Sequence, residues 1–300
     1  MLDVIIALLP AVFAGVWFFG PRVAVVCLVT AVTCVAAEYI SRKIMKRENT
    51  IGDLSAVVTG LLLALNLPPT IEIWKAMVGG AVAIVLVKQL FGGIGQNFMN
   101  PALTARVMLL ISWGESMTRW RLPKTDAISG ATPMALAKAL FRTGAAPAAL
   151  PGYIDMFIGN IAGCIGETSA AAILIGGLYL LIRGVISWET PVAYIGSVAV
   201  LTLILGGNGG LMTGDPLYHI LGGGLLLGAF FKATDYSTSP MTKKGKLIMG
   251  LGCGLLTSVI RLYTGYPEGV SFAILIMNVI VPLIDRYTVP RAFGGEKTDA

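Results

Sequence analysis

Ten long runs of apolar residues constrain the fold of this chain more than any other feature. They cover residues 4–20, 23–40, 54–66, 73–91, 100–113, 166–187, 191–206, 216–232, 246–262 and 268–285. An α-helix needs about 20 residues to cross a bilayer, and in lipid a helix satisfies its own backbone hydrogen bonds. Charged residues make up only 13% of the chain, against about a quarter in soluble domains. The sequence therefore predicts an all-α polytopic membrane protein with about ten transmembrane helices.

Two of these segments are too short for a full crossing. Segment 54–66 stops at Pro68-Pro69, and segment 100–113 begins at Asn100-Pro101. Irregular backbone at membrane depth is tolerated only where protein or a cavity surrounds it. We therefore expect broken or partial helices at the functional interior.

A weak internal repeat divides the chain into two related halves. Residues 74–80 and 90–101 resemble residues 218–224 and 231–240. In both copies a glycine-bearing apolar helix leads into a polar segment that ends in a cap residue followed by proline. This pattern predicts one membrane domain over residues 1–300, whose halves enclose a site near the midplane.

The distribution of lysine and arginine predicts the orientation in the membrane. Basic residues gather in three regions, namely Arg42, Lys43, Lys46 and Arg47, then Lys243, Lys244 and Lys246, and finally Arg286, Arg291 and Lys297. Such residues favour the cytoplasmic side. Both termini and the tail 286–300 are then cytoplasmic, and the loop 114–165 lies outside. That loop is itself basic, with Arg119, Arg121, Lys124, Lys138 and Arg142, which a phosphate or an acidic partner on that side would explain.

The outer loop contains the string Asp126-Ala127-Ile128-Ser129-Gly130-Ala131-Thr132, followed by Pro133. Thr132 suits a helix N-cap and Pro133 a first helical position, before a short helix over 134–141. The first N–H groups of that helix and its dipole would face whatever the Thr132 hydroxyl carries. These local features alone are compatible with an ordinary capped loop or with an attachment point for an anion.

The string matches a motif, Asp-x-x-Ser/Thr-Gly-Ala-Thr, of the membrane subunits RnfD and NqrB, which are similar to each other. In that family a flavin transferase joins FMN to the last threonine through a phosphoester. Further blocks extend the resemblance over most of the chain: Asp53–Ala56, Thr59–Pro69, Gly92–Asn97, Asn100–Ala102, Ala233–Pro240 and Tyr266–Gly269. The chain is more similar to RnfD than to NqrB, because it reaches its first apolar segment almost at once.

The resemblance implies a subunit of an Rnf-type complex in the inner or plasma membrane, which passes electrons between ferredoxin and NAD while sodium ions or protons cross. FMN would be held by Thr132, with Gly130 and Ala131 giving access and with Asp126 and Ser129 serving recognition. The implied partners are flavoprotein and iron–sulfur subunits, the flavin transferase and lipid, with no nucleic acid. Two alternatives remain, a channel or transporter of urea- or ammonium-channel-like fold, and a structural anchor for redox subunits.

Other polar residues within apolar segments complete the candidates. Arg106 is expected to pair with Asp235 or Glu167, or to face a second, non-covalent flavin such as riboflavin, which NqrB is thought to hold. Lys88, Lys232 and Arg183 are expected to extend their charges to the membrane surface. The scattered cysteines and the single His219 predict neither an iron–sulfur cluster nor a metal site, and no side chain is expected to catalyse a reaction by itself.

Overall fold

The computed structural model describes residues 1–125, 128–129, 131–143, 150–207 and 212–289, with only the backbone at 128 and 129. The first part contains α1 (Leu2–Phe19), α2 (Arg22–Ile44), η1 (Ile51–Asp53), α3 (Ser55–Leu65), α4 (Ile73–Val82), η2 (Ala83–Gln89), α5 (Pro101–Ser112) and α6 (Gly114–Met117). The middle contains β1 (Trp120–Arg121), β2 (Ile128–Ser129), α7 (Pro133–Thr143) and α8 (Tyr153–Ile158). The last part contains α9 (Ala170–Ile182), α10 (Glu189–Leu205), α11 (Pro216–Leu221), α12 (Leu225–Leu227), η3 (Gly228–Lys232), α13 (Lys243–Tyr263) and α14 (Val270–Thr288).

A helical segment forms in each of the ten apolar runs, so the predicted all-α membrane fold is confirmed. Among the described residues, α1, α2, α13 and α14 are long and apolar enough to cross a membrane as single helices. Helices α3 and α5 have 11 and 12 residues, or about 17 Å at 1.5 Å per residue, against about 30 Å of hydrocarbon. Both are partial helices, as their flanking prolines predict.

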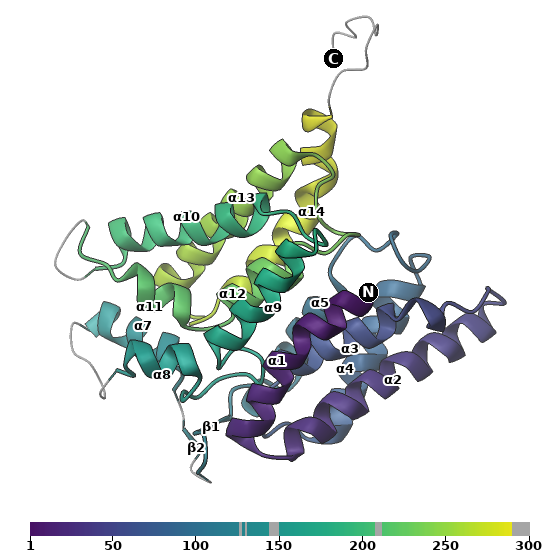
Figure 1. The fold of residues 1–300 in the computed structure, drawn as a ribbon, viewed down its shortest axis with the longest axis horizontal. Helices are drawn as coiled ribbons and strands as arrows, with labels where there is room; N and C mark the ends of the chain where they lie inside the picture. The colour runs from purple at the N-terminus through teal and green to yellow at the C-terminus, as the bar shows by residue number, and fades with distance from the viewer. Residues whose placement is uncertain (126–127, 130, 144–149, 208–211, 290–300) are drawn as a thin grey trace, which may run out of the picture.

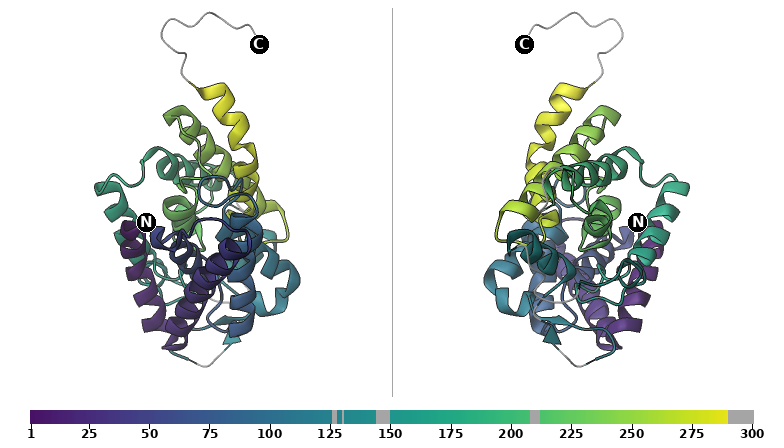
Figure 2. Two further views of the ribbon diagram at one scale, coloured as in Figure 1. Left: turned by 90° about the vertical axis from the view of Figure 1, so that its right-hand side faces the viewer. Right: turned by 90° about the vertical axis from the view of Figure 1, so that its left-hand side faces the viewer.

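The helices form two groups that lie side by side (Figure 1). Helices α1 to α5 make one group, and α10, α13 and α14 belong to the other; α9 packs along α1 between them. Figure 2 shows that the β1–β2 hairpin and the end of α14 lie at opposite ends of the molecule. The fold therefore separates the β1–β2 pair from the carboxyl-terminal end of α14.

Each copy of the predicted repeat contains a π-helical break, which the sequence did not predict. In η2, Leu90 N donates to Val85 O, and in η3, Ala233 N donates to Gly228 O, both in the wider i to i+5 pattern. Each break ends close to a lysine, Lys88 in η2 and Lys232 in η3. The repeat is therefore visible in the backbone as well as in the sequence.

An irregular segment over residues 161–169 is buried next to the end of α3. Gly166 N donates to Leu65 O over 2.8 Å, and Ile165 N donates to Leu67 O over 3.0 Å. These bonds satisfy carbonyls that the end of a helix leaves without partners. Hydropathy predicted a helix from residue 166. Helix α9 begins only at Ala170, and the residues before it include the backbone N–H donors that bind the carbonyls at the end of α3.

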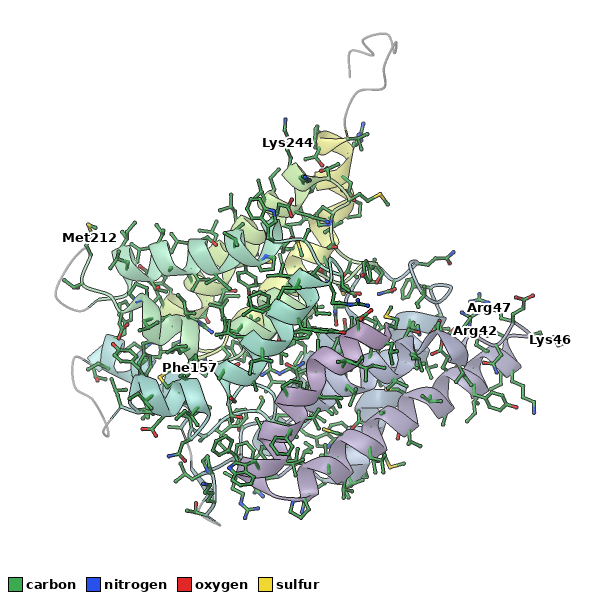
Figure 3. All side chains as sticks on the ribbon, viewed as in Figure 1. Arg42, Lys46, Arg47, Phe157, Met212 and Lys244 are labelled. Carbon is green, nitrogen blue, oxygen red and sulfur yellow. The ribbon has the colours of Figure 1, made fainter. Side chains whose placement is uncertain are left out.

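Basic residues from two predicted cytoplasmic connections lie away from α7 and α8. Figure 3 shows Arg42, Lys46 and Arg47 at the far end of α2 and Lys244 at the start of α13. Phe157 in α8 and Met212 lie on the opposite side of the same view. The predicted cytoplasmic basic residues therefore lie away from the end of the molecule that carries α7 and α8.

Candidate functional site

Thr132 caps α7, as its position before Pro133 predicts. Ala135 N donates to the Thr132 hydroxyl oxygen over 3.3 Å, and Leu136 N donates to the Thr132 carbonyl oxygen over 3.0 Å. The helix runs for 11 residues with Pro133 as its first. Thr132 is only 3% exposed, so its hydroxyl belongs to the interior of the protein.

The other residues of the motif are described to different extents. Asp126 and Gly130 lie outside the described residues. The backbone of Ser129 belongs to β2 and pairs with Trp120 of β1 in an antiparallel register. Ala131 is partly buried beside Thr132. Of the five predicted site residues, the structure therefore gives side-chain surroundings only for Ala131 and Thr132.

Basic residues of α7 hold the connection between α13 and α14. Lys138 Nζ donates to Tyr266 O over 2.7 Å and to Ile260 O over 3.4 Å, and Arg142 Nη2 donates to Thr264 O over 2.5 Å. Burial, together with the charge of Arg142, lowers the pKa of the Lys138 ammonium to about 8. These two cations of the outer loop therefore bind backbone carbonyls.

A cavity of about 70 Å³ lies between α5, the α6–β1 segment and the start of α14, and Thr132, just before α7, is part of its wall. Polar or charged members of the same wall are Arg106, Thr118, Glu268 and Ser271. A space of this size holds more than one water molecule, whose share of liquid volume is about 30 Å³. It can therefore receive a phosphate group.

Arg106 lies at the centre of the contacts behind this cavity. Its Nε donates to the Asn66 carbonyl oxygen at the end of α3 over 3.3 Å, Nη1 donates to the Ser271 hydroxyl, and Nη2 donates to Cys164 Sγ over 3.6 Å. Nη2 also forms ion pairs with Glu167 at 3.7 Å and with Glu268 at 3.6 Å. A cation at the carboxyl end of α3 also interacts favourably with the negative end of the helix dipole.

The predicted pairing of Arg106 with Glu167 is confirmed, and Glu268 is a second partner that sequence reasoning missed. The proposed alternative, Asp235, instead accepts hydrogen bonds from Asn100, Ser237 and Thr238. Glu268 is the charged residue of the Tyr266–Gly269 block, and this could have marked it as a candidate site residue. Its contact with Arg106 could not be predicted, because the two residues lie far apart in the sequence.

Five ionisable residues form what we call the buried charge cluster: Arg106, Glu167, Lys232, Arg261 and Glu268. Lys232 Nζ donates to Asn66 Oδ1 over 2.5 Å, so it shares Asn66 with Arg106. Arg261 donates to the carbonyl oxygens of His219 and Gly222. Lys232 and Arg261 are 1% and 2% exposed, and the side chains of Arg106, Glu167 and Glu268 are 11%, 2% and 11% exposed.

The expectation that Lys232 and Lys88 reach the membrane surface is wrong. Lys88 is only 3% exposed and binds Glu38 in α2. Both π-helical breaks direct their lysines toward polar partners inside the protein, and those partners come from other helices. Arg183, by contrast, keeps an exposed side chain and pairs with Asp3.

The cysteines are buried and free. His219 is also buried, and its Nδ1 has no hydrogen-bond partner among the described residues. Across the described parts of the chain, no group of three or more His, Cys, Asp and Glu side chains could hold a metal ion.

The sequence of this chain is similar to subunits of ion-translocating oxidoreductase complexes. A model of the NQR2, RnfD, RnfE family matches residues 1–294. The D component of the Na⁺-translocating ferredoxin:NAD⁺ oxidoreductase complex of Acetobacterium woodii is 49% identical, over 99% of this chain and 91% of the relative. The proton-translocating counterpart of Clostridium ljungdahlii is 44% identical over 98% and 91%. The D component of an ion-translocating oxidoreductase complex of Stutzerimonas stutzeri is 40% identical over 98% and 91%.

Proposed function

This chain belongs to the NQR2, RnfD, RnfE family, and we propose that it is the membrane subunit of an Rnf-type complex that relays electrons between ferredoxin and NAD. Its relatives match it over nearly their whole length and are named as D components of ion-translocating oxidoreductases. The chain thus acts as part of a translocase. Coupling to sodium ions or to protons follows from the names of those relatives, which include both.

We further propose that Thr132 carries FMN through a phosphoester. The observation that supports this is the position of Thr132, which caps the amino-terminal end of α7 and lies in the wall of a cavity that Arg106 also lines. Helix N-termini and arginine both favour phosphate. The residues therefore fit the group. FMN supplies the electron-accepting chemistry, and the protein supplies placement and electrostatics.

In this proposal the phosphate of FMN occupies the cavity in whose wall Thr132 lies, and a neighbouring subunit approaches the isoalloxazine. Flavoprotein and iron–sulfur subunits of the complex are the proposed electron partners. Because Thr132 is 3% exposed, the flavin transferase needs the covering segments to open, or it acts before they close.

The proposed orientation has both termini in the cytoplasm and Thr132 on the outer side of the cell membrane. The basic residues at the end of α2 and the start of α13 lie away from α7 (Figure 3), and such residues favour the cytoplasm. A second, non-covalent flavin remains a proposal for another part of the chain, because Arg106 faces the Thr132 cavity. Mass analysis of gently extracted cofactor would count the flavins.

Replacing Thr132 by valine tests the attachment. The full chain is produced with the flavin transferase, and flavin is measured by in-gel fluorescence and by mass spectrometry of the Thr132 peptide. Thr132→Val removes the ester oxygen at nearly constant shape, so all covalent FMN should be lost while the protein still inserts. Thr118→Val, in the same cavity wall, is the matched control and should keep its FMN. Normal flavin content in Thr132→Val, or an unmodified wild-type peptide, would leave the channel or anchor alternatives.

A further inference from the structure

The guanidinium of Arg106 has hydrogen-bonding capacity that the described residues do not use. Arginine has five N–H donors, and three hydrogen bonds from Arg106 are formed, to Asn66, Ser271 and Cys164. Glu167 and Glu268 lie 3.7 and 3.6 Å from Nη2, beyond good hydrogen-bond distance. The carboxylates therefore neutralise charge without saturating the donors, and another oxygen acceptor can bind.

The buried charge cluster is also unbalanced. In their ionised forms, Arg106, Lys232 and Arg261 bring three positive charges and Glu167 and Glu268 bring two negative ones. Buried charge is expensive unless it is paired. One additional negative charge next to Arg106 would make the cluster neutral, and the cavity that Arg106 shares with Thr132 is the place for it.

We propose that Arg106 is the counter-ion of the phosphodiester that Thr132 carries. This inference rests on the proposed attachment of FMN and names the residue that receives its phosphate. A phosphodiester has one negative charge, which matches the excess of the cluster. Arg106 lines the cavity from α5, and Thr132 lines it from the position before α7, where the helix dipole also favours a negative charge.

The basic residues of the outer loop are weaker candidates for this role. Lys138 and Arg142 direct their charges to carbonyl oxygens of the α13–α14 connection, and Arg119 pairs with Glu115. None of these three lines the cavity beside Thr132. The arginine that serves the phosphate comes from a membrane-embedded partial helix and not from the loop that carries the motif.

Glu268 must respond to the phosphate, because it lines the same cavity and has the same sign of charge. Its Oε2 is buried without a hydrogen-bond donor among the described residues. A β-carbon built on Gly223 would lie 3.0 Å from Glu268 Oε1 and 3.1 Å from Arg261 Nη2. Arg261 and Glu268 therefore both lie beside Gly223, and a shift of either side chain would bring them together once Arg106 turns to the phosphate.

A comparison of loaded and unloaded protein tests this role of Arg106. The full chain is made in loaded form with the flavin transferase, and in a permanently unloaded form that carries Thr132→Val. Melting temperatures are then measured for both forms with and without Arg106→Gln. Arg106→Gln should lower the melting temperature of both forms, but by roughly 5 °C more in the loaded form, because only that form has a buried phosphate that is left unpaired. Arg106→Lys, which keeps the charge, should remove most of this difference.

The control is Lys88→Gln, which removes another buried cation at the opposite end of α3 and should lower both forms equally. Equal losses from Arg106→Gln in the two forms overturn the inference, since a purely structural arginine gives that result. If Arg106→Gln does not fold, the ³¹P NMR signal of the phosphodiester is compared between loaded wild type and loaded Arg106→Lys. A signal at the same chemical shift in both proteins would overturn the inference. Absence of FMN from wild-type Thr132 overturns the proposed function and this inference together, whereas FMN with equal losses overturns the inference alone.

Discussion

The two π-helical breaks have similar backbones and opposite electrostatics. At the end of η2, Lys88 Nζ donates to both carboxylate oxygens of Glu38, each over 3.0 Å, and to the Ser55 hydroxyl. At the end of η3, Lys232 Nζ donates to the neutral amide oxygen of Asn66 over 2.5 Å. Both lysines are almost fully buried. The first half has a balanced ion pair, and the second half has a cation that shares its partner with another cation, Arg106.

This difference shows which lysine lacks a carboxylate partner of its own. A lysine held by its own carboxylate fixes the packing of three helices and needs nothing more. A lysine and two arginines that outnumber their carboxylates would be stabilised by one more negative charge. The halves resemble each other in sequence, but the excess positive charge gathers where they meet, behind Thr132.

The largest expected effect separates the two lysines directly. In the unloaded Thr132→Val background, Lys88→Met should cost about 3–5 kcal/mol of unfolding free energy, because Glu38 is left buried without a cation. Lys232→Met should cost about 1–2 kcal/mol, because only a neutral acceptor loses its donor and the cluster becomes balanced. Thermal and denaturant unfolding in detergent would measure both.

A double variant serves as the control for the first lysine. Lys88→Met with Glu38→Leu removes both charges and should recover much of the stability lost in the single variant, as replaced buried ion pairs do. Equal costs for Lys88→Met and Lys232→Met would break the comparison and show that both lysines are paired alike.

Much of this fold could be predicted from the sequence, and the residues show why. The apolar runs predicted every long helical segment, and the prolines at 68, 69 and 101 marked the two partial helices. Thr132 and Pro133 correctly predicted the start of α7, because capping is local. The partners of Lys88, Lys232 and Glu268 could not be predicted, since Glu38, Asn66 and Arg106 lie far away in sequence. A buried lysine and a lysine at the membrane surface have the same local pattern.

A second substitution makes the second half resemble the first. Asn66→Asp gives Lys232 a carboxylate and balances the buried charge cluster without any phosphate. The rise in melting temperature that FMN loading produces should therefore shrink by roughly half, which corresponds to a change of about 1–2 kcal/mol. Loaded and unloaded proteins are compared for wild type and variant. The Asn66 amide also donates to Leu62 O, and Asn66→Asp removes this hydrogen bond. The melting temperature of the unloaded variant measures the cost of that loss by itself. An unchanged rise on loading would mean that the charge excess does not stabilise the bound phosphate.

The smallest expected effect compares Gly80 with Gly224, which occupy equivalent positions in the repeat. A β-carbon on Gly80, inside α4, would lie 3.2 Å from Cys34 Sγ, and the gain in helix propensity of about 0.5–1 kcal/mol offsets that crowding. A β-carbon on Gly224, outside a regular helix, would displace the Glu167 carboxylate from its place beside Arg106. Gly80→Ala should therefore be nearly neutral, and Gly224→Ala should cost about 1–3 kcal/mol. The unfolding free energy of Gly224→Ala is measured with and without Arg106→Gln. The destabilisation by Gly224→Ala should be smaller in the Arg106→Gln background, because the ion pair of Arg106 with Glu167 is already absent there. An equal destabilisation in both backgrounds would indicate overpacking as the cause.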